Sequence, residues 1–132
     1  MVEKTHSILI VSNWQQRRLS LVSIFNTLAD NSAITAVDFV HTWTNLNERQ
    51  ADILVVDRWS PSDDITELIR AIKQKYPGTR ILVLDCFAGR SRSFNLYPAD
   101  VVLESDLPPN QIVDAVRQLL SSEPSGPLQV EA

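Results

Sequence analysis

Short aliphatic runs alternate with helix-like segments along the whole chain, and this alternation limits the possible folds more than any other feature of the sequence. Unbroken runs of Ile, Leu and Val, as at 8–11, 53–56 and 81–84, are typical of strands that are buried on both faces. The half-alternating segment 33–40 and the short run 101–103 predict two further strands. Strands separated by helices form right-handed crossover units, so the sequence predicts an α/β fold with a doubly wound, five-stranded parallel sheet.

The segment 15–29 predicts the first helix. Its apolar residues recur at three-residue steps, with Leu21 and Ile24 beside them, and are expected to face the sheet: Leu19, Val22, Phe25 and Leu28. Arg17 and Arg18 are then expected on the solvent side of the helix. Ser12 and Asn13 precede it, and their side chains are typical helix caps.

Four later segments are expected to be helical. A short polar helix with little to bury is predicted over 44–50, and another helix follows the loop 60–64. A weaker helical pattern covers 89–98. The last helix begins at 106–109, where two prolines occupy the first turn, in which a missing N–H costs little.

The composition excludes several classes of protein. The 132 residues suffice for one domain, placed at 1–120, and the Ser-, Pro- and Gly-rich end 121–132 is expected to be a disordered, linker-like tail. The net charge is −4 and the basic residues are scattered, so no nucleic-acid surface is expected on this chain alone. One cysteine excludes an internal disulfide and a multi-cysteine zinc site, and three glycines leave no phosphate-binding loop. No apolar run could span a membrane, so a cytoplasmic protein is expected.

Three predicted strands end in polar residues at the point where the aliphatic run stops. Ser12 and Asn13 follow the first strand, and Asp57 and Asp85 end two later strands. Functional groups of parallel α/β sheets collect beyond the carboxyl ends of the strands, so these side chains form the candidate site. Asp57 and Asp85 either form a carboxylate pair that shares a proton, or stay separate, with Asp85 directed to solvent and Asp57 bonded to loop groups such as Ser12.

A resemblance to a known family is strongest over 51–61, an aliphatic strand that ends at Asp57 and is followed four residues later by a proline. This segment resembles the phosphoacceptor strand of the receiver domains of two-component response regulators. The segments 8–11, 81–84 and 107–112 are similar to the first strand, the fourth strand and the start of the last helix of that family. The resemblance implies a flavodoxin-like sheet of strand order 2-1-3-4-5, with Asp57 at the position that accepts a phosphoryl group.

The sequence departs from this family at the positions that assist phosphorylation. In receivers an acidic pair after the first strand holds Mg²⁺ together with the phosphoacceptor, and here that pair is replaced by Ser12 and Asn13. The Thr or Ser that binds phosphoryl oxygens is replaced by Asp85, and the Lys of the fifth strand by Glu104 or Ser105. These changes make the site more negative, which opposes phosphoryl transfer. No cofactor is therefore expected, with Mg²⁺ only if the phosphoacceptor site is competent.

The departures favour a pseudo-receiver, a signalling module that works by protein–protein contact or as a homodimer, with weak or no phosphorylation. One alternative is an authentic phosphoacceptor, in which a histidine kinase phosphorylates Asp57 and the chain is the N-terminal part of a DNA-binding transcription regulator. Another is a small hydrolase with Asp57 as nucleophile. The hydrolase is disfavoured because Trp59 replaces the acid of an Asp-x-Asp phosphatase, so no enzymatic activity is expected.

Other candidate residues surround the same pocket. Trp14 and Trp59 flank its mouth, where they either close the pocket or form an exposed aromatic patch for a partner. Cys86 is expected to be a buried packing thiol. The expected partners are a histidine kinase, an output domain or a second copy of the chain. A partner surface is predicted between residues 90 and 120 and carried by four residues: Arg90, Arg92, Phe94 and Tyr97.

Overall fold

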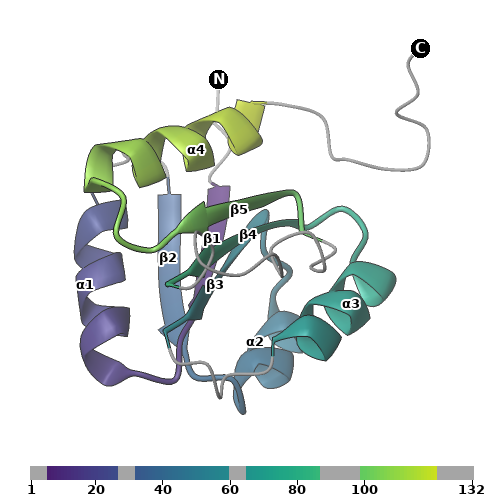
Figure 1. Cartoon of the computed structure of the whole chain (residues 1–132). Helices are drawn as coiled ribbons and strands as arrows, with labels where there is room; N and C mark the ends of the chain where they lie inside the picture. The colour runs from purple at the N-terminus through teal and green to yellow at the C-terminus, as the bar shows by residue number, and fades with distance from the viewer. Residues whose placement is uncertain (1–5, 27–31, 60–64, 87–98, 122–132) are drawn as a thin grey trace.

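The computed structural model describes residues 6–26, 32–59, 65–86 and 99–121, which form a parallel sheet covered by helices on both faces (Figure 1). The strands are β1 (His6–Val11), β2 (Ser32–Val37), β3 (Ile53–Arg58), β4 (Arg80–Asp85) and β5 (Val101–Glu104). The helices of the described residues are α1 (Gln15–Phe25), α2 (Thr42–Glu48), α3 (Thr66–Lys75) and α4 (Pro109–Ser121).

The five strands form one sheet in the order β2-β1-β3-β4-β5, and every neighbouring pair is parallel. In the pair formed by β1 and β3, Ile8 lies opposite Ile53. Because all the strands run in the same direction, their carboxyl ends meet at one edge of the sheet. The predicted fold class and the predicted strand order are both confirmed.

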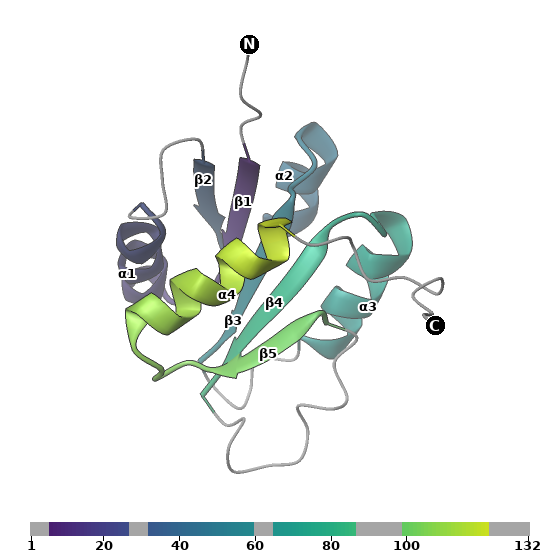
Figure 2. The same cartoon turned by 90° about the horizontal axis from the view of Figure 1, so that it is seen from above.

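The sheet separates two apolar cores. Helices α1 and α4 cover one face, and α2 and α3 cover the other (Figure 2). Along β3, Ile53 and Val55 face α1 and α4, whereas Leu54 and Val56 face α2 and α3, and all four are fully buried. Burying one such side chain contributes about 1.5–3 kcal/mol, which explains why this strand is aliphatic at every position.

Helix α1 presents most of its predicted apolar face to the sheet, where Val22 and Ile24 are partly buried, but Leu19 departs from the prediction. Leu21 and Phe25 are buried, whereas Leu19, expected in the core, is 64% exposed. Three-residue steps drift around a helix that has 3.6 residues per turn, while the four-residue step from Leu21 to Phe25 stays on one face. The helix ends at Phe25, and the rest of the predicted helix, from residue 27 onwards, lies outside the described residues.

The predicted side-chain cap of α1 is wrong. Trp14 occupies the N-cap position and makes no side-chain capping hydrogen bond. The Ser12 hydroxyl oxygen accepts a hydrogen bond from the Trp14 backbone N–H at 3.2 Å. Asn13 Oδ1 accepts one from the backbone N–H of Phe39 at 2.9 Å. These two residues therefore fix the loop after β1 against the segment after β2 and do not cap the helix.

Strand β2 ends earlier, and helix α2 begins earlier, than the sequence predicts. Strand β2 ends at Val37, because Asp38 Oδ1 accepts a hydrogen bond from the His41 backbone N–H at 3.0 Å and the chain turns. Helix α2 begins at Thr42, before the predicted start, and it buries both Thr42 and Leu46. The expectation that this helix has little to bury is therefore wrong.

The remaining predictions for helices and the tail have different outcomes. Helix α4 begins at Pro109, as its prolines predict, and ends at Ser121. The predicted helix over 89–98 and residues 122–132 of the predicted tail lie outside the described residues, so these expectations and the domain boundary stay predictions. Among the described helices, none combines the length and the apolar character needed to cross a membrane.

Candidate functional site

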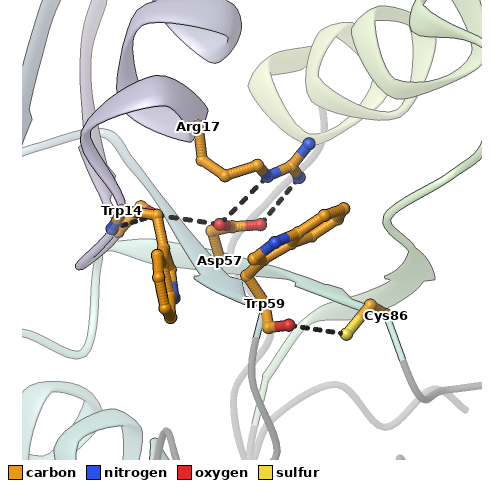
Figure 3. A network of polar contacts seen from close by, with 6 residues as sticks. Trp14, Arg17, Asp57, Trp59 and Cys86 are labelled. Atoms are coloured by element: carbon orange, nitrogen blue, oxygen red, sulfur yellow. Dashed lines mark hydrogen bonds and ion pairs between the residues drawn. The ribbon is translucent and has the colours of Figure 1, made fainter.

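The candidate site is centred on Asp57, whose side chain at the carboxyl end of β3 is fully buried. Alternation along β3 directs it to the face covered by α1 and α4. There Arg17 binds both carboxylate oxygens: Nη2 donates to Oδ1 at 2.8 Å, and Nε donates to Oδ2 at 3.3 Å (Figure 3). The Ser12 hydroxyl donates a third hydrogen bond to Oδ2 at 2.9 Å. Both oxygens of Asp57 are therefore engaged by neighbouring side chains.

Arg17 is the functional residue that the sequence interpretation missed. It lies in the first turn of α1, directly above the end of β3, and its side chain is half-buried rather than solvated. Arg18 is half-buried too, and its Nη1 donates to the backbone oxygen of Ser12 at 2.6 Å. The prediction that both arginines face solvent is wrong. A basic residue in the first turn after β1 is the signal that could have identified Arg17, because that turn lies over the carboxyl edge of the sheet.

Two indole rings border the Arg17–Asp57 pair. The guanidinium of Arg17 lies over the ring of Trp59, 4.3 Å from its centroid, at a distance typical of cation–π contact. Trp14 and Trp59 are nevertheless 46% and 42% exposed. With Gln15, Gln16, Arg17 and Ser20 they line an open hollow of about 390 Å³. The sequence predicts that the indoles either close the pocket or form an exposed aromatic patch. Trp59 fits both alternatives, because it covers the Arg17 guanidinium and also presents aromatic surface to solvent.

Asp85 belongs to a separate ion pair on the opposite face of the sheet. The register places Asp85 beside Arg58, one residue beyond Asp57. Because consecutive strand residues point to opposite faces, Asp57 and Asp85 face away from each other. Arg58 Nη1 donates to the two oxygens of Asp85 at 3.1 and 3.3 Å, and the Asp85 side chain is fully buried. The predicted carboxylate pair and the predicted solvent-exposed Asp85 are both wrong.

Comparisons with known proteins show which solved structures share this architecture. No protein-family model matches the chain, and no curated protein matches its sequence. Solved structures do match its fold. A response regulator from Thermotoga maritima has a TM-score of 0.73 at 18% identity, over 89% of this chain and 99% of its own. The isolated REC domain of RcsB from Salmonella enterica serovar Typhimurium, in the presence of phosphomimetic BeF3⁻, has a TM-score of 0.72 at 18% identity, over 96% of both chains. A CheY-like receiver domain protein from Methanospirillum hungatei has a TM-score of 0.69 at 19% identity, over 89% of this chain and 94% of its own.

This chain has the fold of a response-regulator receiver domain. The agreement extends over nearly the whole of each compared domain, and the strand order is the one that the family resemblance implied. At identities below 25%, the likeness concerns the fold alone. The chemistry of this receiver fold must therefore be inferred from the side chains of this chain.

The end of the fifth strand contributes no positive charge to the site at either of the two positions that can correspond to the lysine of the receiver family. Glu104 is exposed at the end of β5, beside Asp85 in the register. Ser105 is buried, its backbone N–H donates to the backbone oxygen of Asp85 at 3.3 Å, and its hydroxyl has no hydrogen-bond partner among the described residues. The described residues also contain no cluster of three or more His, Cys, Asp or Glu that could hold a metal ion.

Cys86 follows β4 at the same edge of the receiver fold. Its thiol donates to the Trp59 backbone oxygen at 3.0 Å. The residue is only partly buried, so the prediction of a buried thiol is wrong. Burial of the thiol, reinforced by the negative charge of Asp85, raises the pKa of Cys86 above its ordinary value, which disfavours the reactive thiolate. Of the predicted partner surface, Arg90, Arg92, Phe94 and Tyr97 lie outside the described residues.

Proposed function

We propose that this chain is a receiver-like signalling module that acts by contact with a protein partner and does not depend on phosphorylation of Asp57. The observation that carries the proposal is the two-point contact between Arg17 and Asp57. The guanidinium supplies the positive charge that a phosphorylated receiver takes from a metal ion. In this interpretation the site is a permanent ion pair within the fold.

The hydrogen bonds of Asp57 oppose its use as a nucleophile. An aspartate that attacks a phosphoryl donor needs a free oxygen and cations that neutralise the developing charge. Here one oxygen is bonded to Arg17 and the other to both Arg17 and Ser12. Freeing the carboxylate means breaking a buried ion pair, and loss of one partner of such a pair typically costs about 3–5 kcal/mol.

The side chains around Asp57 do not fit Mg²⁺, a hard cation that prefers anionic and carbonyl oxygens. The hydroxyl of Ser12 already donates to Asp57, and the amide oxygen of Asn13 already accepts from Phe39. Arg17 would also place its positive charge beside the ion. We therefore expect Arg17 to exclude Mg²⁺ from this site.

An authentic phosphoacceptor is the second candidate function. Asp57 stands at the end of β3, and Arg17 is a residue type that binds phosphoryl oxygens well. The RcsB domain of similar fold was solved in the presence of a phosphomimetic. Under this alternative, Arg17 would turn from the carboxylate to the phosphoryl group.

The proposed partners are proteins: a histidine kinase, an output domain or a second copy of this chain. An RcsB structure from the same Salmonella serovar is bound to the promoter rprA, but the present chain covers only 61% of that protein. We propose that this chain contacts neither nucleic acid nor a membrane and that the protein is cytoplasmic. The exposed indoles of Trp14 and Trp59 are candidates for the contact surface, because Trp is enriched in the residues that dominate binding energy.

Incubation with acetyl phosphate and Mg²⁺, followed by intact-mass measurement, tests the proposal. Wild-type protein is expected to gain no phosphoryl group, because both Asp57 oxygens are engaged. A species that carries one phosphoryl group in wild type and is missing from Asp57→Asn would contradict the proposal and support the second candidate. Glu67→Gln, which removes the charge of an exposed carboxylate on α3, is the matched control for Asp57→Asn.

A further inference from the structure

The guanidinium of Arg17 has an edge that Asp57 does not use and that opens into the hollow between Trp14 and Trp59. A guanidinium carries five N–H donors, and Asp57 accepts from one on Nε and one on Nη2. The other three, two on Nη1 and one on Nη2, have no acceptor within the described part of the chain. Figure 3 shows Nη1 directed away from the carboxylate of Asp57. Arg17 lines the hollow and is 19% exposed, so this edge is open to a ligand.

The free edge of Arg17 has the geometry that binds a carboxylate. The hydrogens that remain on Nη1 and Nη2 form a planar fork of parallel donors, which a carboxylate accepts at two points. The lining of the hollow brings no negative charge, because it consists of two indoles, two glutamines, a serine and Arg17. Asp57 lies across the guanidinium from this fork, and its charge is compensated by Arg17 and Ser12. The amino end of α1 beside the hollow adds partial positive charge.

The rest of the hollow fits an aromatic ring. Four large hydrophobic side chains are exposed among the described residues, and two of them, Trp14 and Trp59, line this hollow. Within the described residues, ring contact joins Trp43 and Tyr76 but not these two indoles, so both keep aromatic surface free. Such surface is stabilised when another planar ring packs against it. The volume of about 390 Å³ lies within the range of small-molecule sites.

We propose that the hollow between Trp14 and Trp59 binds a small planar aromatic carboxylate. The ring covers the exposed surface of the two indoles, and the carboxylate accepts two hydrogen bonds from the free edge of Arg17. The inference goes beyond the proposed function and does not rest on it, because the ligand reaches Arg17 while Asp57 stays paired. A bound ring changes the aromatic surface that a protein partner meets, so it supplies an input that does not pass through Asp57.

Isothermal titration calorimetry of the full chain with three matched probes tests the site. The first probe, 2-naphthoate, has both the aromatic ring and the carboxylate, and it is expected to bind with a dissociation constant of about 1 mM or lower. The second, 2-naphthamide, keeps the ring without the charge. The third, cyclohexanecarboxylate, keeps the charge without an aromatic ring. Each of these two is expected to bind about tenfold or more weakly than 2-naphthoate, because each lacks one of the two contacts.

Variants assign the two contacts to their residues. Arg17→Lys keeps a positive charge beside Asp57 but removes the fork, so it is expected to lose the preference for the acid over the amide. Trp14→Ala removes one indole and is expected to weaken the binding of both ring compounds by about tenfold. Leu19→Ala, at an exposed position of α1 that does not line the hollow, is the control and should bind all three probes as wild type does.

Three results would overturn the proposal: no saturable heat with 2-naphthoate at about ten times the expected dissociation constant, equal binding of the acid and the amide by wild type, or unchanged binding in Trp14→Ala. The first two need no variant, so the test holds even if Arg17→Lys fails to fold. Phosphorylation of Asp57 by acetyl phosphate would contradict the proposed function and leave these binding results as they stand. Failure of the ligand site and failure of the proposed function are therefore distinguishable.

Discussion

At the residue scale, two buried carboxylates each have an arginine that neutralises them. Asp57 pairs with Arg17 on one face of the sheet, and Asp85 pairs with Arg58 on the other. The sequence placed both aspartates correctly at strand ends but did not reveal their partners. Extending the alternation of β3 by one residue would have directed Arg58 away from Asp57 and toward Asp85. Whether the Arg17 side chain reaches Asp57 depends on how α1 is rotated on the sheet, and sequence periodicity alone does not determine this rotation.

Arg17→Met is expected to lower the free energy of unfolding by about 3 kcal/mol, because it leaves the fully buried Asp57 carboxylate without its charged partner. Urea unfolding at neutral pH measures this. The double variant Arg17→Met/Asp57→Asn is expected to recover much of the loss, since no unpaired charge remains. Arg70→Met removes an arginine of the exposed pair with Glu67 and should cost less than about 1 kcal/mol. Equal losses of unfolding free energy in Arg17→Met and Arg70→Met would show that the buried Arg17–Asp57 pair stabilises the fold no more than an exposed ion pair does.

Cys86 is expected to react slowly with iodoacetamide in the folded protein. Burial and the nearby Asp85 charge raise its pKa above the ordinary value of 9.0, so the thiolate forms only at higher pH. The alkylation rate of folded protein should therefore rise with a midpoint above pH 9.0, whereas urea-unfolded protein should have its midpoint near that value. A folded-state midpoint below pH 9.0 would instead indicate an activated thiol.

At the scale of elements, the central strands were predicted well, whereas the apolar face of α1 was predicted only in part. β3 and β4 are aliphatic at nearly every position because both of their faces are buried. These strands can therefore be predicted without knowing which residues face which side of the sheet. Helix α1 has apolar residues around much of its circumference, so several faces look equally able to pack. The structure selects Leu21 and Phe25 and leaves Leu19 at the surface.

Leu21→Ala is expected to destabilise the protein by about 3 kcal/mol, because it removes a fully packed side chain and leaves a cavity. Leu19→Ala makes the same chemical change on the same helix, but at a solvated position, and should change stability by less than about 0.5 kcal/mol. Thermal or urea unfolding of the two variants measures the difference. If Leu19→Ala were the more damaging change, α1 would be rotated relative to this description.

Helix α1 also offers a site for stabilisation, because its N-cap residue Trp14 makes no side-chain capping bond. Trp14→Ser supplies a hydroxyl that can accept a hydrogen bond from the first turn. Compared with Trp14→Ala, which removes the same indole without adding an acceptor, it should be about 1 kcal/mol more stable. Equal stability of the two variants in urea unfolding would mean that the Ser12 hydroxyl already satisfies this end of the helix.

At the scale of the whole molecule, the order of strands and helices was readable from the sequence because each crossover unit permits few arrangements. The site lies where that topology requires, at the carboxyl edge of the parallel sheet. Its chemistry is set by single side chains: two arginines neutralise two carboxylates, and the fifth strand brings no cation. The receiver fold is therefore present, and we propose that its side chains do not form the arrangement that phosphoryl transfer needs.

The availability of Asp57 to a metal ion and a phosphoryl group is tested most directly by the tryptophan fluorescence of the full chain during titration with Mg²⁺ and then with beryllofluoride, a phosphoryl mimic. Trp59 lies against Arg17 and Trp14 beside it, so binding at Asp57 would alter their emission. We expect no saturable change up to millimolar Mg²⁺ with beryllofluoride, because Arg17 and Ser12 already hold both oxygens of Asp57. A saturable change in wild type that is lost in Asp57→Asn would contradict this expectation.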